Sequence, residues 1–336
     1  MNEKIQNRSE IVFLYDVTDA NPNGDPLDEN KPRMDEEENI NIVTDVRLKR
    51  TARDYLDSKG EKIFIKEEER EDCTQKSRAR RLAEFLAENP NISEEWRISP
   101  EDVENKEVST LKNKLKEINY KDIDKALLET YIDLRLFGSM IAVENSTITN
   151  IGPVQFNFGR SLHEVSPNFT KGSTVMPSQE GAEQGTLTEM WNLPYSLIAF
   201  HGVVNENAAE ETNLTRKDVD KLLEGLWVGT KNLLTRSKKG HSPKMLLEIE
   251  YDEDNYHIGG LRKKIGIKTE KDEVKIRSTE EYKLDLKELI ESLKKNKEKI
   301  EKIRYKISED LNIENNMDDD LVKEMGKIAE LEEINF

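Results

Sequence analysis

Runs of apolar residues predict four β-strands spread over most of the chain. Residues Ile11–Tyr15 are continuously apolar, which is typical of a strand buried on both faces. Apolar and polar residues alternate toward the end of Thr147–Phe158, so this segment is expected to be a strand with one buried face. Tyr195–Val204 and Met245–Tyr251 supply the third and fourth predicted strands.

Two helices are expected between these strands. The first begins at Thr44 or Asp45, either of which can cap a helix, and runs to about Asp57. Its apolar residues share one face: Leu48, Ala52, Tyr55 and Leu56. Its cations lie on the opposite face: Lys49, Arg50 and Arg53. The second helix opens at residues 215–218 with a sequence that resembles a capping box, and it continues with leucines on one face.

The order strand, helix, strand, strand, helix, strand is the βαββαβ pattern of the ferredoxin-like fold, which RNA recognition modules share. We therefore expect an α+β protein with a ferredoxin-like, RRM-like core at residues 1–57 and 139–270. Short amphipathic stripes predict a helical insertion at residues 58–138, and a charged helical extension is expected at residues 271–336. Residues 159–190 carry several glycines and little periodicity, as in a long functional loop.

Composition restricts the class of protein. Charged residues make up 36% of the 336 residues, and the net charge at pH 7 is −17. The apolar run at Ile11–Tyr15 is too short for a signal peptide, and no segment approaches the roughly 20 apolar residues of a membrane span. The single cysteine, Cys73, has no partner for an internal disulfide. These features predict a cytoplasmic protein with no membrane partner.

A net charge of −17 argues against a nucleic-acid partner, but the cations are concentrated in two places. Residues 231–247 contain five lysines and arginines and no acid, and residues 47–53 contain four. Acidic residues gather instead in residues 16–45 and after residue 270. Basic clusters of this kind are often only solvated surface. Charge alone therefore leaves both interpretations open.

Five segments, taken together, are similar to the backbone subunit of type I CRISPR effector complexes, most closely that of subtype I-B. They are, in chain order, Phe13–Val17, Asn21–Pro26, Ile42–Tyr55, Phe137–Met140 and Gly152–Phe156. The most specific feature is a helix with the sequence Leu-Lys-Arg-x-x-Arg that follows an Asn-Gly turn. The resemblance extends from about residue 8 to about residue 265.

The resemblance implies a hand-shaped, non-catalytic protein that binds CRISPR guide RNA. Its palm would be the ferredoxin-like core, its fingers the helical insertion, and its thumb the loop at residues 159–190. Copies of the protein would assemble head to tail along the guide, with each thumb reaching its neighbour. Other subunits of the complex, called Cascade, and the target DNA strand are the further partners implied. No cofactor is expected.

Cations on the first helix are the first candidates for RNA contact. Lys49, Arg50 and Arg53 lie about one turn apart, so they can follow successive phosphates along a strand. Thr44 can add a hydroxyl at the helix start, where backbone N–H groups favour anions. The alternatives are ion pairs of these cations with neighbouring aspartates, and a simple N-cap role for Thr44.

The basic loop after the second helix supplies the next candidates. Its possible RNA ligands are Arg236, Ser237, Lys238, Lys239, His241 and Ser242. Ammonium, hydroxyl and imidazole groups suit phosphate and ribose, and Gly240 permits close approach of the backbone. The alternative is a basic segment that only complements the dipole of the preceding helix.

The predicted thumb supplies the third set of candidates: Arg160, Lys171, Met176 and Trp191. In the family that the sequence resembles, this loop presses between bases of the guide at regular intervals. Met176 would act there as a wedge and Trp191 as a stacking surface. Trp191, close to Pro194, can equally belong to the core. The acidic residues of the loop favour a neighbouring protein as a further contact.

Two other functions compete with RNA coating. In related type III complexes the equivalent subunit cuts RNA with an aspartate near the first loop, and clustered carboxylates can bind metal. The acids of that loop here are Asp25, Asp28, Asp35, Glu36, Glu37 and Glu38. The four histidines are not spaced as metal ligands and no phosphate-binding glycine motif occurs, so we expect no catalytic residue and no metal. A scaffold with protein partners only is the third function, which the net charge favours.

Overall fold

The structure is a computed structural model in which the chain divides into two compact units. It describes residues 3–68, 75–89, 103, 120–143, 146–173, 187–314 and 320–336. The insertion unit comprises Met1–Gln6, Arg53–Gln155 and Asn205–Leu222. The sheet unit comprises Asn7–Ala52, Phe156–Val204 and Leu223–Phe336.

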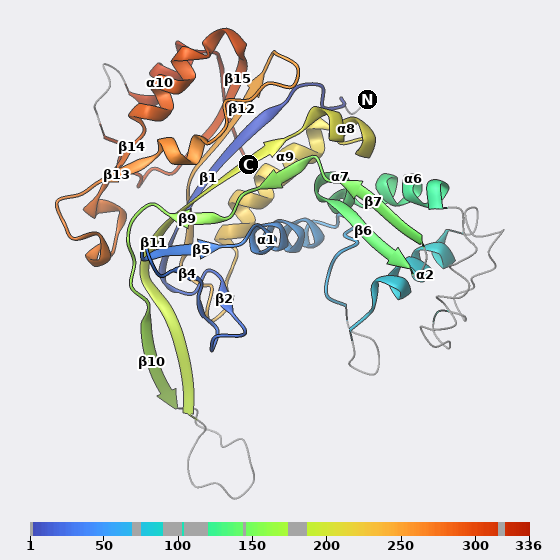
Figure 1. The fold of residues 1–336 in the computed structure, drawn as a ribbon, viewed down its shortest axis with the longest axis horizontal. Coiled ribbons are helices and arrows are strands. Elements are labelled where there is room, and N and C mark those ends of the chain that lie inside the picture. Colours follow the sequence, from blue (N-terminus) through green and yellow to red (C-terminus); the bar gives the residue numbers. More distant parts are fainter. Residues whose placement is uncertain are drawn as a thin grey trace, which may run out of the picture. The chain divides into compact units, whose positions relative to one another are not determined.

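A ten-stranded mixed sheet forms most of the sheet unit (Figure 1). Eight strands follow one another in space: β16 (Glu330–Glu333), β15 (Ile300–Ile307), β12 (His241–Tyr251), β1 (Ser9–Ala20), β11 (Leu187–Val204), β9 (Gly159–Ser161), β5 (Ile40–Val43) and β4 (Met34–Asp35). Two more strands pair with β11: β8 (Val154–Phe156) and β10 (Asn168–Ser173). Along the path of eight, only β15 and β16 pair in parallel.

The central strand, β1, is buried on both faces, as its continuous apolar sequence predicts. The side chains of Ile11, Val12, Phe13 and Leu14 are completely shielded from solvent. Because successive side chains point to opposite faces of a strand, both faces of the sheet are covered here. The other predicted strands are confirmed within β11 and β12, and in β7 and β8, which divide the second segment.

Both predicted helices of the core are also confirmed. The first is α1 (Asp45–Ser58), and the second is α9 (Arg216–Glu224), which continues into a π-helical turn at Gly225–Gly229. The sheet unit also contains two separate two-stranded sheets. They are β2 (Gly24–Asp25) with β3 (Lys31–Pro32), and β13 (Gly266–Lys268) with β14 (Lys283–Asp285).

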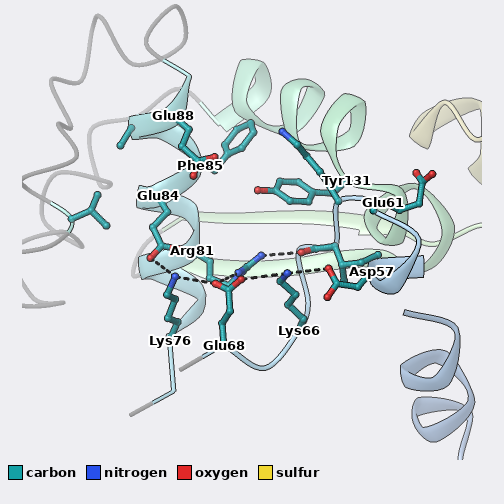
Figure 2. A pocket seen from close by; sticks show the side chains of 15 residues that line it. Asp57, Glu61, Lys66, Glu68, Lys76, Arg81, Glu84, Phe85, Glu88 and Tyr131 are labelled. Carbon is teal, nitrogen blue, oxygen red and sulfur yellow. Dashed lines mark hydrogen bonds and ion pairs between the residues drawn. The ribbon is translucent and has the colours of Figure 1, made fainter. Parts of the chain in front are cut away.

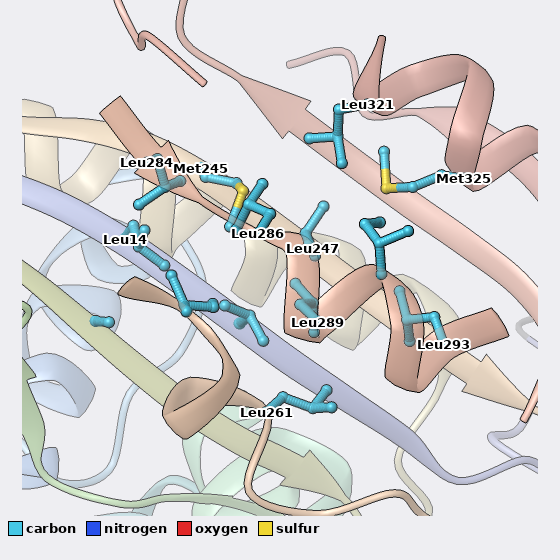
Figure 3. Packing of buried hydrophobic residues seen from close by; sticks show 14 of the residues in the cluster. Leu14, Met245, Leu247, Leu261, Leu284, Leu286, Leu289, Leu293, Leu321 and Met325 are labelled. Atoms are coloured by element: carbon cyan, nitrogen blue, oxygen red, sulfur yellow. The ribbon is translucent and has the colours of Figure 1, made fainter. Parts of the chain in front are cut away.

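One face of the sheet carries a hydrophobic core to which much of residues 261–328 contributes (Figure 3). We expected charged helix after residue 270, and this expectation is wrong for much of the segment. The chain there forms β14, α10 (Lys287–Lys295), β15, α11 (Leu321–Gly326) and β16, and two of these strands extend the main sheet. Arg304 of β15 pairs with Glu248 at 2.9 Å and with Glu332 at 3.1 Å. A strand is recognised in a sequence by alternating apolar and polar residues. Charged residues that pair across strands, as Arg304 does, interrupt this alternation.

The expected thumb loop is partly strand. β9 joins the main sheet between β11 and β5, and Asn168–Ser173 pair with Leu187–Asn192 in antiparallel register. These pairs satisfy backbone groups that an irregular loop would leave to water. The expected wedge, Met176, lies outside the described residues.

The insertion unit has a hydrophobic core of its own. Among its described residues, the helices that lie wholly within the unit are α2 (Arg78–Glu88), α6 (Tyr120–Thr130), α7 (Ile132–Phe137) and α8 (Glu206–Thr212), and most of α9 belongs to it as well. β6 (Gly138–Val143) pairs there with β7 (Ser146–Ile151). Leu82, Phe85 and Leu127 are buried in this core, on the stripes that the sequence predicts. The unit begins at Arg53 and includes Asn205–Leu222, so its bounds differ from the expected insertion at residues 58–138.

Candidate nucleic-acid interface

Thr44 fastens the beginning of α1 to the turn that follows β1. The side-chain oxygen of Asn23 accepts hydrogen bonds from the backbone N–H and the hydroxyl of Thr44, both at 2.9 Å. The hydroxyl oxygen in turn accepts the backbone N–H of Arg47 at 3.3 Å. Thr44 therefore caps the helix, the role that the sequence left open as its alternative.

The basic loop at residues 235–240 lies against the end of β1. The ammonium group of Lys238 donates to the carbonyl oxygens of Asn21 at 2.6 Å and Pro22 at 3.0 Å. Gly240 has a φ of +108°, and a Cβ there would lie 2.3 Å from the carbonyl oxygen of Thr18. Only glycine fits this position without displacing the strand.

The ring of His241 packs against this loop. Its ring is 6% exposed and stacks on Tyr15, with ring centroids 5.5 Å apart. Nδ1 contacts the carbonyl oxygen of Lys238, and Nε2 is buried without a hydrogen-bond partner among the described residues. Burial first, and then the charges of Lys238 and Arg47, lower the pKa of His241 to about 4. We expected His241 to contact RNA; its ring packs on Tyr15 and contacts the backbone of the loop, and contact with RNA stays a prediction.

Arg47 brings a second cation to the same place. Burial, followed by the positive charge of Arg47, lowers the pKa of Lys238 to about 8. A guanidinium N–H of Arg47 donates to the hydroxyl of Thr51 at 3.1 Å, which holds the side chain along α1. Arg47 therefore acts electrostatically on Lys238, which lies at the end of β1.

The three cations that we assigned to an exposed face of α1 do not share one environment. The ammonium group of Lys49 pairs with Asp45 at 3.1 Å, and Arg50 is exposed. The Arg53 side chain is only 12% exposed, and its Nε lies 3.1 Å from the carboxylate of Asp133, which is fully buried. Its guanidinium also lies 4.9 Å from the ring centroid of Phe137. The expectation of a continuous cationic face is therefore corrected at Arg53, which links parts of the insertion unit.

A groove of about 560 Å³ opens beside Thr44 in the sheet unit. Trp191 lines it, with its ring centroid 4.7 Å from that of Phe169 and 5.2 Å from the ammonium nitrogen of Lys31. The indole N–H of Trp191 is buried and has no acceptor among the described residues. Carboxylates of Asp25 and two neighbouring acids share the lining. The groove therefore offers a planar surface rather than a cationic one.

The remaining candidates are dispersed around these features. Arg160 contacts the carboxylates of Asp35 and Glu38, the latter at 3.0 Å, and Lys171 pairs with Glu189 at 3.5 Å on exposed strands. Three further residues are exposed or partly exposed at the basic loop: Arg236, Ser237 and Lys239. Ser242 follows in β12 and is partly buried.

Arg47 belongs to this site but is not among the individual RNA ligands that the sequence predicts. The sequence did place it in a cationic cluster, three residues after Thr44 and three before Arg50. Residues three or four apart share a helix face, so this spacing is the signal that could have selected it. Its approach to Lys238 could not be read from the sequence, because the two are far apart along the chain.

Comparison with known proteins assigns the chain to a family. Residues 7–287 match the family model described as CRISPR-associated protein Cas7. The chain belongs to the Cas7 family. A curated CRISPR-associated protein Cas7 of Haloferax volcanii is 33% identical to it over 315 residues, which cover 88% of this chain and 85% of the relative. The family match includes every candidate residue named above, whereas β15 and β16 lie beyond it.

Two solved structures resemble this Cas7-family chain in fold. One, described as a CRISPR RNA-guided surveillance complex, pre-nicking, has a TM-score of 0.56 and 14% identity, with 97% of this chain and 96% of that chain covered. A chain of another CRISPR RNA-guided surveillance complex has a TM-score of 0.51 and 13% identity, with coverages of 96% and 94%. At these identities the likeness concerns the fold alone.

The acidic first loop of the Cas7-family chain is largely neutralised by cations. Asp25 pairs with Arg33 at 2.8 Å and Asp28 with Lys31 at 2.9 Å, while Asp35 contacts Arg160. Among the described residues, no group of three or more His, Cys, Asp or Glu is arranged to hold a metal ion. None of the described helices has the length and hydropathy needed to cross a membrane.

The insertion unit of the Cas7-family chain contains a cavity of about 530 Å³ that is rich in charge (Figure 2). Figure 2 shows Lys66, Lys76 and Arg81 linked to carboxylates across its wall. Glu68 accepts from both Lys76 and Arg81, at 2.9 and 2.6 Å. Burial alone would raise the pKa of Glu68, but these cations lower it to about 2. Lys66, Lys76 and Arg81 are therefore already paired with carboxylates of the protein.

Proposed function

We propose that this chain is a non-catalytic backbone subunit of a type I surveillance (Cascade) complex, of subtype I-B, and that it binds the sugar-phosphate backbone of CRISPR guide RNA. The observation that carries the proposal is the placement of the basic loop, where Lys238 is held against the turn at Asn21–Pro22 and has a pKa lowered by burial and by the charge of Arg47. Membership of the Cas7 family supports it.

A phosphate group between these two cations would offset their repulsion. Burial and the charge of Arg47 both destabilise the ammonium form of Lys238, and an anion beside it would relieve a destabilisation that an isolated surface lysine does not carry. Two of the three ammonium protons of Lys238 point to carbonyl oxygens, which leaves the third for a phosphate oxygen. Arg50, Arg236 and Lys239 would extend the contact to neighbouring phosphates.

The groove beside Thr44 suits bases better than phosphates, because carboxylates share its wall with Trp191. A base would stack on the indole ring, and the unpaired indole N–H would donate to a base acceptor. Lys171 and Met176, on the proposed thumb, remain proposed RNA contacts, with Met176 as a wedge between bases, and the thumb would reach the next copy of the chain. The order of copies would be head to tail, because a contact that does not close on itself gives a helical filament.

The palm of the proposed hand is the set of strands β12, β1, β11 and β9. Their spatial order, fourth, first, third and second along the chain, is the order of a ferredoxin-like sheet. The fingers correspond to the insertion at residues 58–138. Other Cascade subunits and the target DNA strand are the further proposed partners, in the cytoplasm.

The proposal is tested by RNA binding to the purified full-length chain. Unrelated RNAs of equal length should bind with similar affinity, and log affinity should fall with log salt concentration by about 0.7 for each phosphate neutralised. Native mass spectrometry on RNAs of increasing length should show copies added in steps. An affinity that does not change with salt concentration contradicts the proposal and favours a scaffold with protein partners only.

The pairing of acids with cations in the first loop favours a non-catalytic backbone subunit over a metal-dependent ribonuclease. A nuclease site needs carboxylates free to bind metal, whereas Asp25 and Asp28 are held by Arg33 and Lys31. Bound RNA should therefore remain intact for hours with Mg²⁺ or Mn²⁺. Metal-dependent cutting that disappears in Asp25→Ala would reassign the chain as a ribonuclease.

A further inference from the structure

One asparagine of the chain is followed by glycine, and it lies next to the turn that receives Lys238. Asn23-Gly24 is the only Asn-Gly pair in the 336 residues. Glycine has no side chain to keep the preceding carboxamide away from its backbone nitrogen, and asparagine is one of the chemically labile residues of proteins. Both residues are partly exposed, so water and hydroxide reach them. The pair is therefore a candidate site of covalent change.

The carboxamide of Asn23 is held at its oxygen by two donors. The backbone N–H and the hydroxyl of Thr44 each donate to Oδ1 of Asn23 at 2.9 Å. The hydroxyl oxygen accepts the backbone N–H of Arg47, so its own proton is directed to Asn23. Thr44 immediately precedes α1, where the positive end of the helix dipole favours negative charge. Two donors and a helix N-terminus around such an oxygen are the components of an oxyanion hole.

The backbone nitrogen of Gly24 is the group that can attack this carboxamide. Nδ2 of Asn23 lies 3.4 Å from the carbonyl oxygen of Gly24, so the side chain is folded over the residue that follows it. Gly24 opposes Pro32 where β2 pairs with β3. The preceding pair is hydrogen-bonded, because Arg33 donates its N–H to the carbonyl oxygen of Asn23 at 3.1 Å. Since hydrogen-bonded and non-hydrogen-bonded pairs alternate in an antiparallel ladder, the N–H of Gly24 points away from β3 and is not held by the ladder.

The turn needs the glycine that makes its neighbour labile. A Cβ at Gly24 would lie 2.1 Å from Oδ1 of Asn30, so a larger residue would displace the turn. Asn21 offers a comparison within the same segment. It is 2% exposed, and it precedes Pro22, whose nitrogen carries no proton and cannot make this attack. The reactive combination is therefore confined to Asn23 in this turn.

We propose that Asn23 is a site of spontaneous self-modification, in which the backbone nitrogen of Gly24 attacks Cγ of Asn23 and Thr44 stabilises the oxyanion that develops on Oδ1. The nitrogen of Gly24 loses its proton to solvent, and the new C–N bond closes a cyclic imide. The bond from Cγ to Nδ2 breaks, and Nδ2 takes a proton from solvent and leaves as ammonia. One water molecule then opens the imide at either carbonyl, which gives aspartate or isoaspartate. The change occurs once in each chain and is not turnover.

The products would alter the surroundings of Lys238, a consequence that rests on the proposed function. The carbonyl oxygens of Asn21 and Pro22, which accept the ammonium group of Lys238, directly precede Asn23 in the chain. Aspartate would add a negative charge beside them, and isoaspartate would also lengthen the main chain by one carbon atom. Either product should lower the affinity for RNA, so the protein would lose this activity with age and without proteolysis.

The test follows the covalent change itself in the full-length chain without RNA, so its outcome does not depend on the proposed function. The folded chain and a synthetic peptide of residues 21–27 are kept in the same mildly alkaline buffer. Peptide mass spectrometry then measures asparagine, aspartate and isoaspartate at position 23. The folded chain should react at least about tenfold faster, the weight of one hydrogen bond to a developing charge. A reaction no faster than that of the peptide overturns the proposal, because the fold would then give no assistance.

Variants of Thr44 test the oxyanion hole. Thr44→Val removes one donor and keeps the shape of the side chain, so the reaction should slow about tenfold. Thr44→Ser keeps the hydroxyl and should retain the wild-type rate, which separates the donor from a merely structural role. The matched control is Thr51→Val, because the Thr51 hydroxyl contacts Arg47 and not Asn23. An unchanged or faster reaction in Thr44→Val, at a melting temperature that shows it folded, overturns the role of Thr44. If Thr44→Val does not fold, the comparison with the peptide decides alone.

Discussion

The cavity of the insertion unit and the Arg47–Lys238 site of the sheet unit use the same residue types in opposite ways. In the cavity, Lys76 and Arg81 share the carboxylate of Glu68, so the protein supplies their counter-charge. At the other site, Lys238 donates to two neutral carbonyl oxygens and has a second cation nearby. The number of cations alone therefore does not identify a site for RNA; the contacts that the protein makes with each cation also matter. A net charge of −17 is therefore compatible with a local site for RNA.

The largest expected effect is on folding, at an internally paired cation. Arg53→Glu would place a carboxylate beside the fully buried Asp133 and should lower the free energy of unfolding by about 3–5 kcal/mol. Arg50→Glu, one turn earlier and exposed, should change it by less than about 0.5 kcal/mol. Thermal and urea unfolding measure both. Equal stability of the two variants would show that Arg53 is not a structural link.

The next largest effect is the loss of RNA affinity, which should differ between mutations in the two regions. Arg47→Glu should weaken RNA binding about a hundredfold, since it reverses one charge of the proposed phosphate site and deprives Lys238 of its neighbour. Lys66→Glu, in the insertion cavity, should change RNA affinity by less than about twofold, because Lys66 already faces Asp57 and Glu68. Filter binding or fluorescence anisotropy at one fixed salt concentration measures the difference. Similar losses in both variants would remove the distinction between the regions.

The smallest effect concerns pH. The pKa of Lys238 in the free protein is lowered to about 8, and a bound phosphate would raise it, so binding takes up a proton above that pH. RNA affinity should therefore be constant below about pH 7 and fall about tenfold between pH 7 and 9. Lys238→Arg should remove this dependence, because arginine stays charged throughout. A fall of the same size in Lys238→Arg would assign the titration to another group.

The central strands and α1 could be predicted because their signals are local. Ile11–Tyr15 are apolar without interruption, and Leu48, Ala52 and Leu56 repeat with helical spacing. The strand nature of β15 was hidden, because Arg304 finds its counter-charges on two neighbouring strands that are distant in sequence. A pattern within one segment carries no information about such partners.

The site was predictable only in part, for the same reason. The sequence identified the basic loop as a candidate site. Lys238 of this loop is the residue on which the charge of Arg47 acts. Arg53 was assigned to the RNA face because a helical projection cannot reveal Asp133, 80 residues later. The acids of the first loop looked free in the sequence, yet Asp35 contacts Arg160. Residue type and spacing give the chemistry that is available, whereas long-range pairing decides which groups remain for a ligand.

The position of β1 has a consequence for how the chain folds during synthesis. This strand ends at Ala20, whereas its neighbours β11 and β12 end much later in the chain, at Val204 and Tyr251. Until the ribosome has released both, the most apolar segment of the chain has no partner on either edge. Contacts of such sequence separation close slowly and leave strand edges exposed to other chains. A chain truncated before residue 251 should therefore aggregate, whereas the complete chain buries the strand.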